Sequence, residues 1–343
     1  MKLTVIGAGS WGTAIAVHLA KANPLAEIHL CPRTELQLHE IQVKGQNQAY
    51  LPGIVLPPTI RLTVDWRALF QETLERDHLL VLATPFAHLQ TIAQAVIKHG
   101  FFPKSWIWLC KGIDPQNGKL AHELMAEAFQ QGDRHSALIQ SGVLSGPSFA
   151  IEVAKGLPCA LTIATQADEL AQLVQSTMHY GNMRIYQTDD LIGVELGGAI
   201  KNILAIAAGI IEQLQLGQNA RAALITRGMA EMTRLGLVMG ARAETFSGLT
   251  GLGDLILTAT GDLSRNKLVG IELAKGHALE MILQNLGHVA EGVRCAHAVR
   301  KLAQQLGVEM PIVEMVCGVL DRHIHPRDAV LQLMARDPKH EIH

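Results

Sequence analysis

The sequence predicts an α/β fold of Rossmann type, a mostly parallel sheet with helices on both faces, followed by an all-α domain. Strand-like and helix-like segments alternate through the first half of the chain, which is typical of such a sheet. After about Asp190 no clear β run follows, and long helical stretches rich in small residues take over. A chain of 343 residues also exceeds what one core usually serves. We therefore predict two domains, residues 1–190 and 191–343.

Short apolar runs bounded by turn residues predict the strands of the first domain. These runs are 3–8, 26–31, 78–85, 106–112, 159–165 and 183–188. Apolar residues at helical spacing predict the intervening and later helices. These segments are 11–22, 88–98, 118–129, 192–214, 221–241 and 295–307.

The composition excludes several classes of protein. Hydrophobic residues make up 48% and charged residues 17% of the chain, which is typical of a folded globular protein. The net charge of −2 and the lack of a basic block argue against a nucleic-acid partner. Five scattered cysteines without a C-x-x-C pair indicate reduced thiols in a cytoplasmic protein. No run of about 18 apolar residues predicts stable membrane insertion, and the histidines have no metal-ligand spacing.

The stretch "TVIGAGSWGTAIAVHLA" (4–20) holds Gly7, Gly9 and Gly12 in the spacing G-x-G-x-x-G. Its place between a strand and a helix, at the start of a βαβ-like run, favours a dinucleotide site. The first glycine permits the tight turn, the second lets the backbone approach a pyrophosphate, and the third lets helix and strand pack closely. A purely structural turn is the alternative, and a bulky Trp11 inside the loop keeps that question open.

The second predicted strand ends in Cys31, Pro32 and Arg33. An NAD-preferring site usually carries an acidic residue about 20 residues past the glycine loop, and here none is placed to hold the ribose hydroxyls. Arg33 is instead suited to the 2′-phosphate of NADPH or to stacking on adenine. We therefore predict NADPH as cofactor, with NADH possible. The alternative for Arg33 is a solvated surface residue.

Lys201 is the single charge between Glu195 and Glu212, in the helical stretch "ELGGAIKNILAIAAGIIE". A lysine among small apolar residues is costly to bury without a partner, and burial disfavours its charged form, which suits proton transfer. Small neighbours leave room for a ligand. The alternative is a lysine that extends its ammonium to water. Lys111 follows a predicted strand at its carboxyl edge, where ligands of open α/β sheets bind, although a solvated lysine is an equal alternative.

The stretch 247–273 is another segment with candidate functional residues. Gly248, Gly251 and Gly253 predict a flexible or tight loop that holds Asp254, with Thr258 one turn later if the segment is helical. Ser264 is suited to cap a new helix, whose first turn then holds Arg265 and Asn266. An arginine and helix N-terminal N–H groups make a phosphate site, and an ordinary capped surface helix is the alternative. Gly146, Pro147 and Ser148 form a turn that enters another helix.

Together these segments resemble the bacterial NAD(P)-dependent glycerol-3-phosphate dehydrogenases. The resemblance lies in seven stretches that run in family order: "GAGSWGTA", "CKGI", "SGPSFA", "ELGGAIKNILAIAAGI", "NARAALITRGMAEM", "GLTGLGDLILTATGDLSRN" and "VAEGV". It implies a Rossmann domain joined to a helical domain. The segment 110–143 departs from the family's plainer pattern, so the register of the strand near residue 140 is left open.

The resemblance also implies residue roles. Those of a cofactor contact fall on Gly7, Gly9, Ser10, Trp11, Gly12, Arg33, Lys111, Ala150, Arg265, Val289 and Glu291. Those of a substrate contact fall on Lys111, Gly146, Ser148, Lys201, Asn202, Asp254, Thr258, Ser264, Arg265 and Asn266. Lys201 matches the catalytic proton acceptor, and Lys111 and Asp254 are assigned as further catalytic residues.

The function implied is reversible, NAD(P)H-dependent reduction of dihydroxyacetone phosphate to sn-glycerol 3-phosphate, which supplies the backbone of phospholipids. No metal is needed, and a homodimer is expected. One alternative is a related two-domain reductase that acts on a non-phosphorylated keto or hydroxy acid. The other is a non-catalytic NAD(P) sensor, which needs no lysine in an apolar helix.

Overall fold

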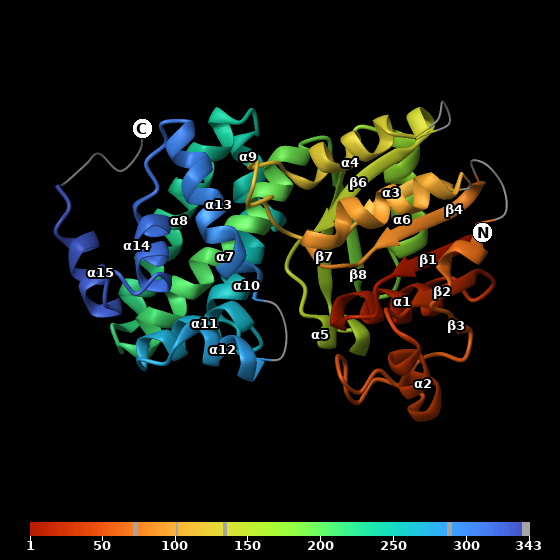
Figure 1. The fold of residues 1–343 in the computed structure, drawn as a ribbon, viewed down its shortest axis with the longest axis horizontal. Helices are drawn as coiled ribbons and strands as arrows, with labels where there is room; N and C mark the ends of the chain where they lie inside the picture. The colour runs from red at the N-terminus through yellow and green to blue at the C-terminus, as the bar shows by residue number, and fades with distance from the viewer. Residues whose placement is uncertain (71–74, 101, 133–135, 287–289, 338–343) are drawn as a thin grey trace. The chain divides into compact units, whose positions relative to one another are not determined.

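The computed structural model describes residues 1–70, 75–100, 102–132, 136–286 and 290–337 (Figure 1). The pattern of contacts divides the chain into two units. Unit 1 contains residues 1–111 and 119–195, and unit 2 contains residues 112–118 and 196–343. The functional division at residue 190 stays a prediction, and each unit is described by itself.

Unit 1 is built on one eight-stranded sheet with the order β3-β2-β1-β4-β5-β6-β7-β8. Neighbouring strands are parallel except for β6 and β7, which are antiparallel. The strands are β1 (Lys2–Ile6), β2 (Glu27–Cys31), β3 (Ile60–Leu62), β4 (Glu75–Leu82), β5 (Pro103–Trp108), β6 (Gln140–Ser145), β7 (Cys159–Thr165) and β8 (Met183–Thr188). All six predicted strands are present. The short β3 and the strand β6, whose register was left open, complete the sheet.

Helices cover both faces of this sheet, as Figure 1 shows for the red-to-green part of the chain. The helices of unit 1 are α1 (Ser10–Ala22), α2 (Glu35–Lys44), α3 (Leu89–His99), α4 (Ala121–Gln130), α5 (Ala150–Lys155) and α6 (Asp168–Met178). Strand β4 shows how the faces are separated: Leu79 and Val81 pack into one core with α1, α5 and α6, whereas Leu80 and Leu82 pack into another with α3 and α4. Such alternation is the period-two geometry of a strand buried on both sides.

Unit 2 is helical in all its described secondary structure, which confirms the predicted fold class of a Rossmann-type sheet followed by helices. The long α7 (Leu191–Gln213) begins in unit 1 and continues into unit 2. The others are α8 (Gly217–Val238), α9 (Ala243–Ser247), α10 (Asp254–Thr260), α11 (Arg265–Ala274), α12 (Leu279–Leu286), α13 (Glu291–Gln305), α14 (Pro311–Leu320) and α15 (Pro326–Met334).

Helix α7 has the length and mean hydropathy of a membrane span, although the charged residues Glu195 and Lys201 interrupt its apolar run. Its mean hydropathy reaches 1.6 over 18 residues, yet 94% of that window is buried inside the protein. A helix that is apolar on all sides is typical of the core of a larger protein as well as of a membrane.

Two glycines bring α7 and α11 into backbone contact within unit 2. A Cβ on Gly209 would lie 1.9 Å from the carbonyl oxygen of Lys267, and one on Gly270 would lie 1.9 Å from that of Ile206. Neither distance leaves room for a side chain, so the two helices approach as closely as their main chains allow. This contact fixes how the first turns of α11 lie against the helix that carries Lys201.

A buried carboxylate joins α8 to α14. Glu231 is 3% exposed, and its two oxygens accept the main-chain N–H groups of Ile312 (2.7 Å) and Val313 (3.3 Å) at the start of α14. Burial raises the pKa of Glu231 to about 7, against the lowering effect of these N–H groups and of Arg234 and Arg227. The carboxyl group therefore holds its proton more tightly in the folded protein than its ordinary pKa of 4.5 in an unfolded chain implies.

We expect this group to make the stability of the protein depend on pH. A raised pKa gives a contribution that is fully present below pH 4.5 and is lost as the pH rises through about 7. Between pH 4.5 and 8 the free energy of unfolding should fall by about 3 kcal/mol from this group alone. Thermal unfolding of the Glu231→Gln variant at both pH values should show that this part of the fall is absent. Glu280→Gln, at a side chain that is 78% exposed, is the control, and an unchanged slope in Glu231→Gln would contradict the assignment.

Candidate active site

The glycine loop joins β1 to α1 in unit 1. Gly7 has a φ of +112°, which side chains other than glycine rarely adopt, and its N–H donates to the carbonyl of Cys31 (3.0 Å). A Cβ on Gly12 would lie 2.0 Å from the carbonyl oxygen of Gly7, whereas a Cβ on Gly9 would meet nothing within 4 Å. The turn, the open approach and the close packing predicted for the three positions are thus all present.

Two side chains outside the motif hold this loop in place. Asn47 is buried, and its amide donates to the carbonyl of Ala8 (2.8 Å) and to the hydroxyl of Thr13 (2.8 Å). The amide of Gln37 also donates to the carbonyl of Ala8 (2.8 Å). Neither residue was predicted, because Asn47 and Gln37 lie 39 and 29 positions beyond Ala8 and no local pattern marks them.

The local geometry fits a dinucleotide. Gly9 is the N-cap of α1 and has no side chain to accept from the first turn, and such a helix start is suited to a phosphate group. The hydroxyls of Thr84, just after β4, and of Ser145, at the end of β6, are buried without a hydrogen-bond partner among the described residues. Buried polar groups are rarely left unpaired in a native fold. Both hydroxyls lie at strand carboxyl ends, where α/β sheets bind ligands.

The other predicted cofactor contacts of unit 1 take individual places around this loop. The hydroxyl of Ser10 donates to the carbonyl of Tyr50 (2.6 Å), and half-buried Trp11 packs against the apolar core on the α1 face of the sheet. Arg33 is exposed two residues after β2, and its main-chain N–H donates to the side chain of Gln37 (3.2 Å). No acidic side chain stands between the end of β2 and Thr34.

Lys111 is half-buried three residues after the end of β5. Lys111 lies in the segment between Trp108 and His122, and the buried carboxylate of Glu195 binds both of these residues. Glu195 accepts from the indole N–H of Trp108 (2.9 Å), the main-chain N–H of His122 (3.0 Å) and Nδ1 of His122 (2.6 Å). Burial pulls the pKa of His122 down, but the hydrogen bond and charge of Glu195 outweigh it, so the pKa is raised. This cluster was not predicted, because Trp108 and Glu195 are 87 positions apart and no local pattern links them.

The turn after β6 carries the predicted contacts Gly146, Ser148 and Ala150. Gly146 has a φ of +141°, and a Cβ there would lie 3.0 Å from the carbonyl oxygen of Ala160. The hydroxyl of Ser148 donates to the carbonyl of Gly146 (3.1 Å), and Ala150 is the first residue of α5. The turn signal in the sequence is therefore a tight turn between a strand and a helix.

In unit 2, Lys201 is buried at 7% exposure, which excludes an ammonium that extends to water. Its Nζ donates to the carboxylate of Asp254 (2.6 Å) and to the hydroxyl of Thr258 (2.8 Å). Asp254 is 1% exposed, and the hydroxyl of Thr258 donates to its main-chain carbonyl (2.6 Å). The three residues, predicted from two separate stretches of sequence, form one buried, hydrogen-bonded group between α7 and α10.

The predicted loop before Asp254 is not a loop. Residues Leu249–Gly253 form a π-helical turn that runs directly into α10. A Cβ on Gly251 would lie 2.0 Å from the carbonyl oxygen of Phe246, so glycine here permits packing rather than flexibility. Such single π turns occur frequently at functional sites, and this one sets where Asp254 begins its helix.

Asn202 and Asn266 form a second buried group that joins three helices. The amide of Asn266 donates to the side-chain carbonyl of Asn202 (2.9 Å), and its own side-chain carbonyl accepts the N–H of Gly292 in α13 (3.1 Å). The amide of Asn202 donates to the carbonyl of Gly198 one turn earlier (3.1 Å). The side chain of Asn266 is thus engaged as a brace between α7, α11 and α13.

Ser264 caps α11 as predicted, because its hydroxyl accepts the N–H of Lys267 (3.2 Å). Arg265, the first residue of α11, is exposed, and Glu291, the first residue of α13, is partly buried. Val289, another predicted cofactor contact, lies outside the described residues.

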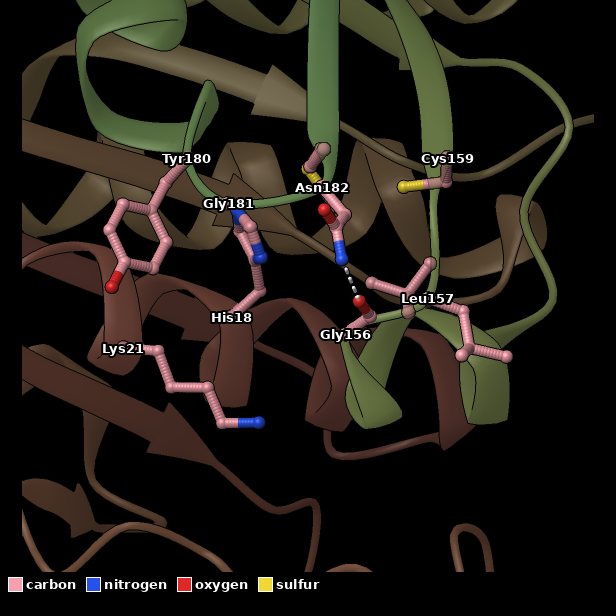
Figure 2. Close-up of a pocket in the computed structure, with 10 residues that line it drawn as sticks. His18, Lys21, Gly156, Leu157, Cys159, Tyr180, Gly181 and Asn182 are labelled. Carbon is pink, nitrogen blue, oxygen red and sulfur yellow. Dashed lines mark hydrogen bonds between the residues drawn. The ribbon is translucent and has the colours of Figure 1, made fainter.

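A separate cavity in unit 1 is lined by residues of α1, of the end of α5 and of the segment before β8 (Figure 2). The imidazole of His18 and the ammonium of Lys21 lie on its α1 side, and the amide of Asn182 donates to the carbonyl of Gly156 (2.9 Å) across it. None of the predicted site residues lines this cavity. Its polar groups serve mainly to satisfy main-chain carbonyls, as Nε2 of His18 does at Met178 (2.7 Å).

Comparison with known proteins decides the family. Residues 2–171 match the family model of the NAD-dependent glycerol-3-phosphate dehydrogenase N-terminus, and residues 190–331 match that of the C-terminus. The chain belongs to the NAD-dependent glycerol-3-phosphate dehydrogenases. This conclusion confirms the resemblance seen in the sequence.

Individual members of the glycerol-3-phosphate dehydrogenase family match over the full length. The chain is 55% identical to the glycerol-3-phosphate dehydrogenase [NAD(P)+] of Polynucleobacter asymbioticus, with 99% of this chain and 100% of the relative covered. It is 51% identical to that of Cupriavidus necator over the same shares. The crystal structure of glycerol-3-phosphate dehydrogenase from Coxiella burnetii is 37% identical, with a TM-score of 0.89 over 98% of this chain and 99% of that one.

Proposed function

We propose that this chain catalyses the reversible, NAD(P)H-dependent reduction of dihydroxyacetone phosphate to sn-glycerol 3-phosphate. The observation that carries the proposal is the buried group of Lys201, Asp254 and Thr258, a proton donor held by two hydrogen bonds between α7 and α10. A non-catalytic NAD(P) sensor has no need of such a group. An ammonium is expensive to bury, and this one stands at the position that the family resemblance assigns to the proton donor, which supports a chemical role.

The proton step follows from this group. As the ketone carbon of the substrate is reduced, its oxygen becomes an alkoxide, and Lys201 donates a proton from Nζ to it; in the reverse direction the lysine accepts that proton. Asp254 and Thr258 hold Nζ in one direction, which limits the reorganisation needed when the charge develops. Lys111 adds positive charge for the oxyanion or the phosphate of the substrate.

The phosphate of the substrate binds, in this proposal, at the start of α11. Arg265 supplies a guanidinium that suits a phosphate, and Ser264 and Asn266 fix the helix N-terminus beside it. Gly146 and Ser148 are assigned to substrate contact as well, on their match to family positions. Binding energy at the phosphate, remote from the reacting carbon, then orients the carbonyl.

The cofactor binds through unit 1 and supplies the hydride when bound. Gly7, Gly9, Ser10, Trp11 and Gly12 hold its pyrophosphate region, with the N–H groups of α1 facing the anion. Exposed Arg33 takes the 2′-phosphate of NADPH, and positions 32–34, directly after β2, hold no acidic residue that would repel it. Further cofactor contacts are assigned to a set of residues that resemble family positions: Lys111, Ala150, Arg265, Val289 and Glu291.

The setting of the enzyme is proposed from the same family relationship. Residues 1–190 act as the cofactor-binding domain and residues 191–343 as the substrate-binding and catalytic domain. The protein acts in the cytoplasm as a homodimer and supplies the glycerol phosphate backbone for phospholipid synthesis. Sedimentation equilibrium of the purified protein tests the dimer.

A spectrophotometric assay of dihydroxyacetone phosphate reduction, run with NADPH and NADH side by side, tests the reaction and the cofactor together. We expect turnover with both and a larger kcat/KM with NADPH. Cofactor binding without turnover would favour the sensor.

Replacement of Arg265 tests whether the substrate carries a phosphate. Because a hydrogen bond to a charged group contributes about 1.5–3 kcal/mol, Arg265→Ala should lower kcat/KM for dihydroxyacetone phosphate about 10- to 100-fold. Arg336→Ala, at an exposed arginine paired with Glu309, is the control. An unchanged kcat/KM in Arg265→Ala, together with turnover of a non-phosphorylated keto acid, would support the related reductase instead.

A further inference from the structure

Lys267 is a second buried lysine in unit 2, and the proton step does not use it. The residue is 4% exposed, in the first turns of α11. Its Nζ donates to the carboxylate of Asp262 (3.0 Å) and to the carbonyl of Thr260 (3.3 Å), and it forms an ion pair with Glu212 (3.1 Å). An ammonium has three hydrogens to donate, and here three acceptors surround it.

The three acceptors come from three different elements. Thr260 is the last residue of α10, Asp262 lies in the turn that follows, and Glu212 is near the end of α7. The carboxylate of Glu212 also accepts from the guanidinium of Arg221 in α8 (2.6 Å). Lys267 therefore holds the turn between α10 and α11 against the start of α11. Through Glu212 and Arg221 it also links this turn to α7 and α8.

This connection joins the two parts of the proposed substrate site. On one side α10 carries Asp254 and Thr258, which hold Lys201, and on the other side Ser264 caps the helix that begins with Arg265. Lys201 and Glu212 are eleven residues apart on α7, three turns of helix, and so lie on one face. One face of α7 therefore contacts both helices: Lys201 binds Asp254 of α10, and Glu212 forms the ion pair with Lys267 of α11.

We propose that Lys267 is a positioning residue for the phosphate of the substrate: it fixes the start of α11, and with it Arg265, relative to the proton donor. This inference rests on the proposed function. Lys267 does not itself contact the phosphate, because its ammonium is buried among three protein acceptors. Loss of the ammonium removes the side-chain links to Asp262 and Glu212, and leaves the turn at 261–264 held by its main-chain hydrogen bonds and by the cap of Ser264.

Steady-state kinetics of Lys267→Met test the inference. The variant keeps the apolar stem and loses the charge, so we expect KM for dihydroxyacetone phosphate to rise about 10- to 100-fold, the size of effect that misplacement of a binding group produces. The dissociation constant for NADPH and the kcat/KM for dihydroxyacetone, which has no phosphate, should stay within twofold of the wild type. Lys267→Arg, which keeps a cation, should restore most of the affinity. Lys275→Met, at an exposed lysine at the end of the same helix, is the matched control.

Each outcome decides the matter. Equal losses with dihydroxyacetone and its phosphate would show a general structural role and overturn the proposal, as would an unchanged KM. If Lys267→Met does not fold, Asp262→Asn replaces it: that side chain is 97% exposed, so its loss weakens the turn without opening the core, and KM should still rise. An unchanged KM in Asp262→Asn would then overturn the proposal. A wild-type enzyme that does not reduce dihydroxyacetone phosphate would instead refute the proposed function itself.

Discussion

Replacement of Lys201 by methionine should lower kcat for dihydroxyacetone phosphate reduction about 10²- to 10⁴-fold, the range that a positioned proton donor contributes. Methionine has a similar length and fits an apolar surrounding, so the substitution removes the ammonium and keeps most of the side-chain volume. Equilibrium binding of NADPH, followed by its fluorescence, should stay within twofold, because the glycine loop belongs to unit 1. Lys275→Met, at an exposed lysine, should keep the activity of the wild type.

The same substitution has a second consequence, which the experiment must separate from the first. Without Lys201 the carboxylate of Asp254, 1% exposed, is left buried without its cation, and breaking such a pair costs about 3–5 kcal/mol of stability. The double variant Lys201→Met with Asp254→Asn removes that buried charge. We expect its thermal unfolding to lie close to that of the wild type while its kcat stays low. A folded Lys201→Met protein with kcat within threefold of the wild type would remove Lys201 as the proton donor.

The sequence predicted those parts of the fold that local pattern determines. A run such as "HLLVLATP" predicts a buried strand, and β4 is one, but the run does not tell that Leu79 and Leu80 face different helices. Strand β3 is three residues long and too short for any pattern to show. The antiparallel pairing of β6 with β7 is set by contacts between Gly142 and Thr165, residues far apart in sequence, and single-strand composition carries no such information.

The candidate site likewise contains features that local sequence predicts and features that depend on residues far apart in the chain. The cap at Ser264 was predictable, because it links residues three positions apart. The lysine at 201 was predictable as costly to bury, and its partner Asp254 was singled out in another stretch. The bonds that brace these residues were not predictable, since Asn266 meets Asn202 across 64 positions and Lys267 meets Glu212 across 55. Such contacts depend on how α7 and α11 pack, and that packing depends on glycines that composition alone does not distinguish from glycines of a turn.

One of these glycines gives a second large expected effect on stability. In an exposed helix, Gly→Ala usually stabilises by about 1 kcal/mol, since alanine is the better helix former. At Gly209 in α7 the added methyl would lie 1.9 Å from the carbonyl oxygen of Lys267 and 2.9 Å from the main-chain nitrogen of Ile271. A main chain cannot move aside as a flexible side chain does, so the two helices must separate. We expect Gly209→Ala to lower the free energy of unfolding by about 3 kcal/mol or more, the upper range for overpacking.

Gly209→Ala should also impair substrate binding. The added methyl would clash with the main-chain carbonyl of Lys267, the residue that holds the turn before Arg265. Any Gly209→Ala protein that folds should therefore show a raised KM for dihydroxyacetone phosphate at unchanged affinity for NADPH. Gly9→Ala makes the same chemical change where a Cβ would meet nothing within 4 Å, and its φ of −78° suits any residue. We expect its melting temperature to equal or exceed that of the wild type while its NADPH binding weakens, since the methyl lies where the pyrophosphate approaches. A Gly209→Ala protein as stable as Gly9→Ala would show that α7 and α11 do not need their backbone contact, and the link from helix packing to phosphate binding would fail with it.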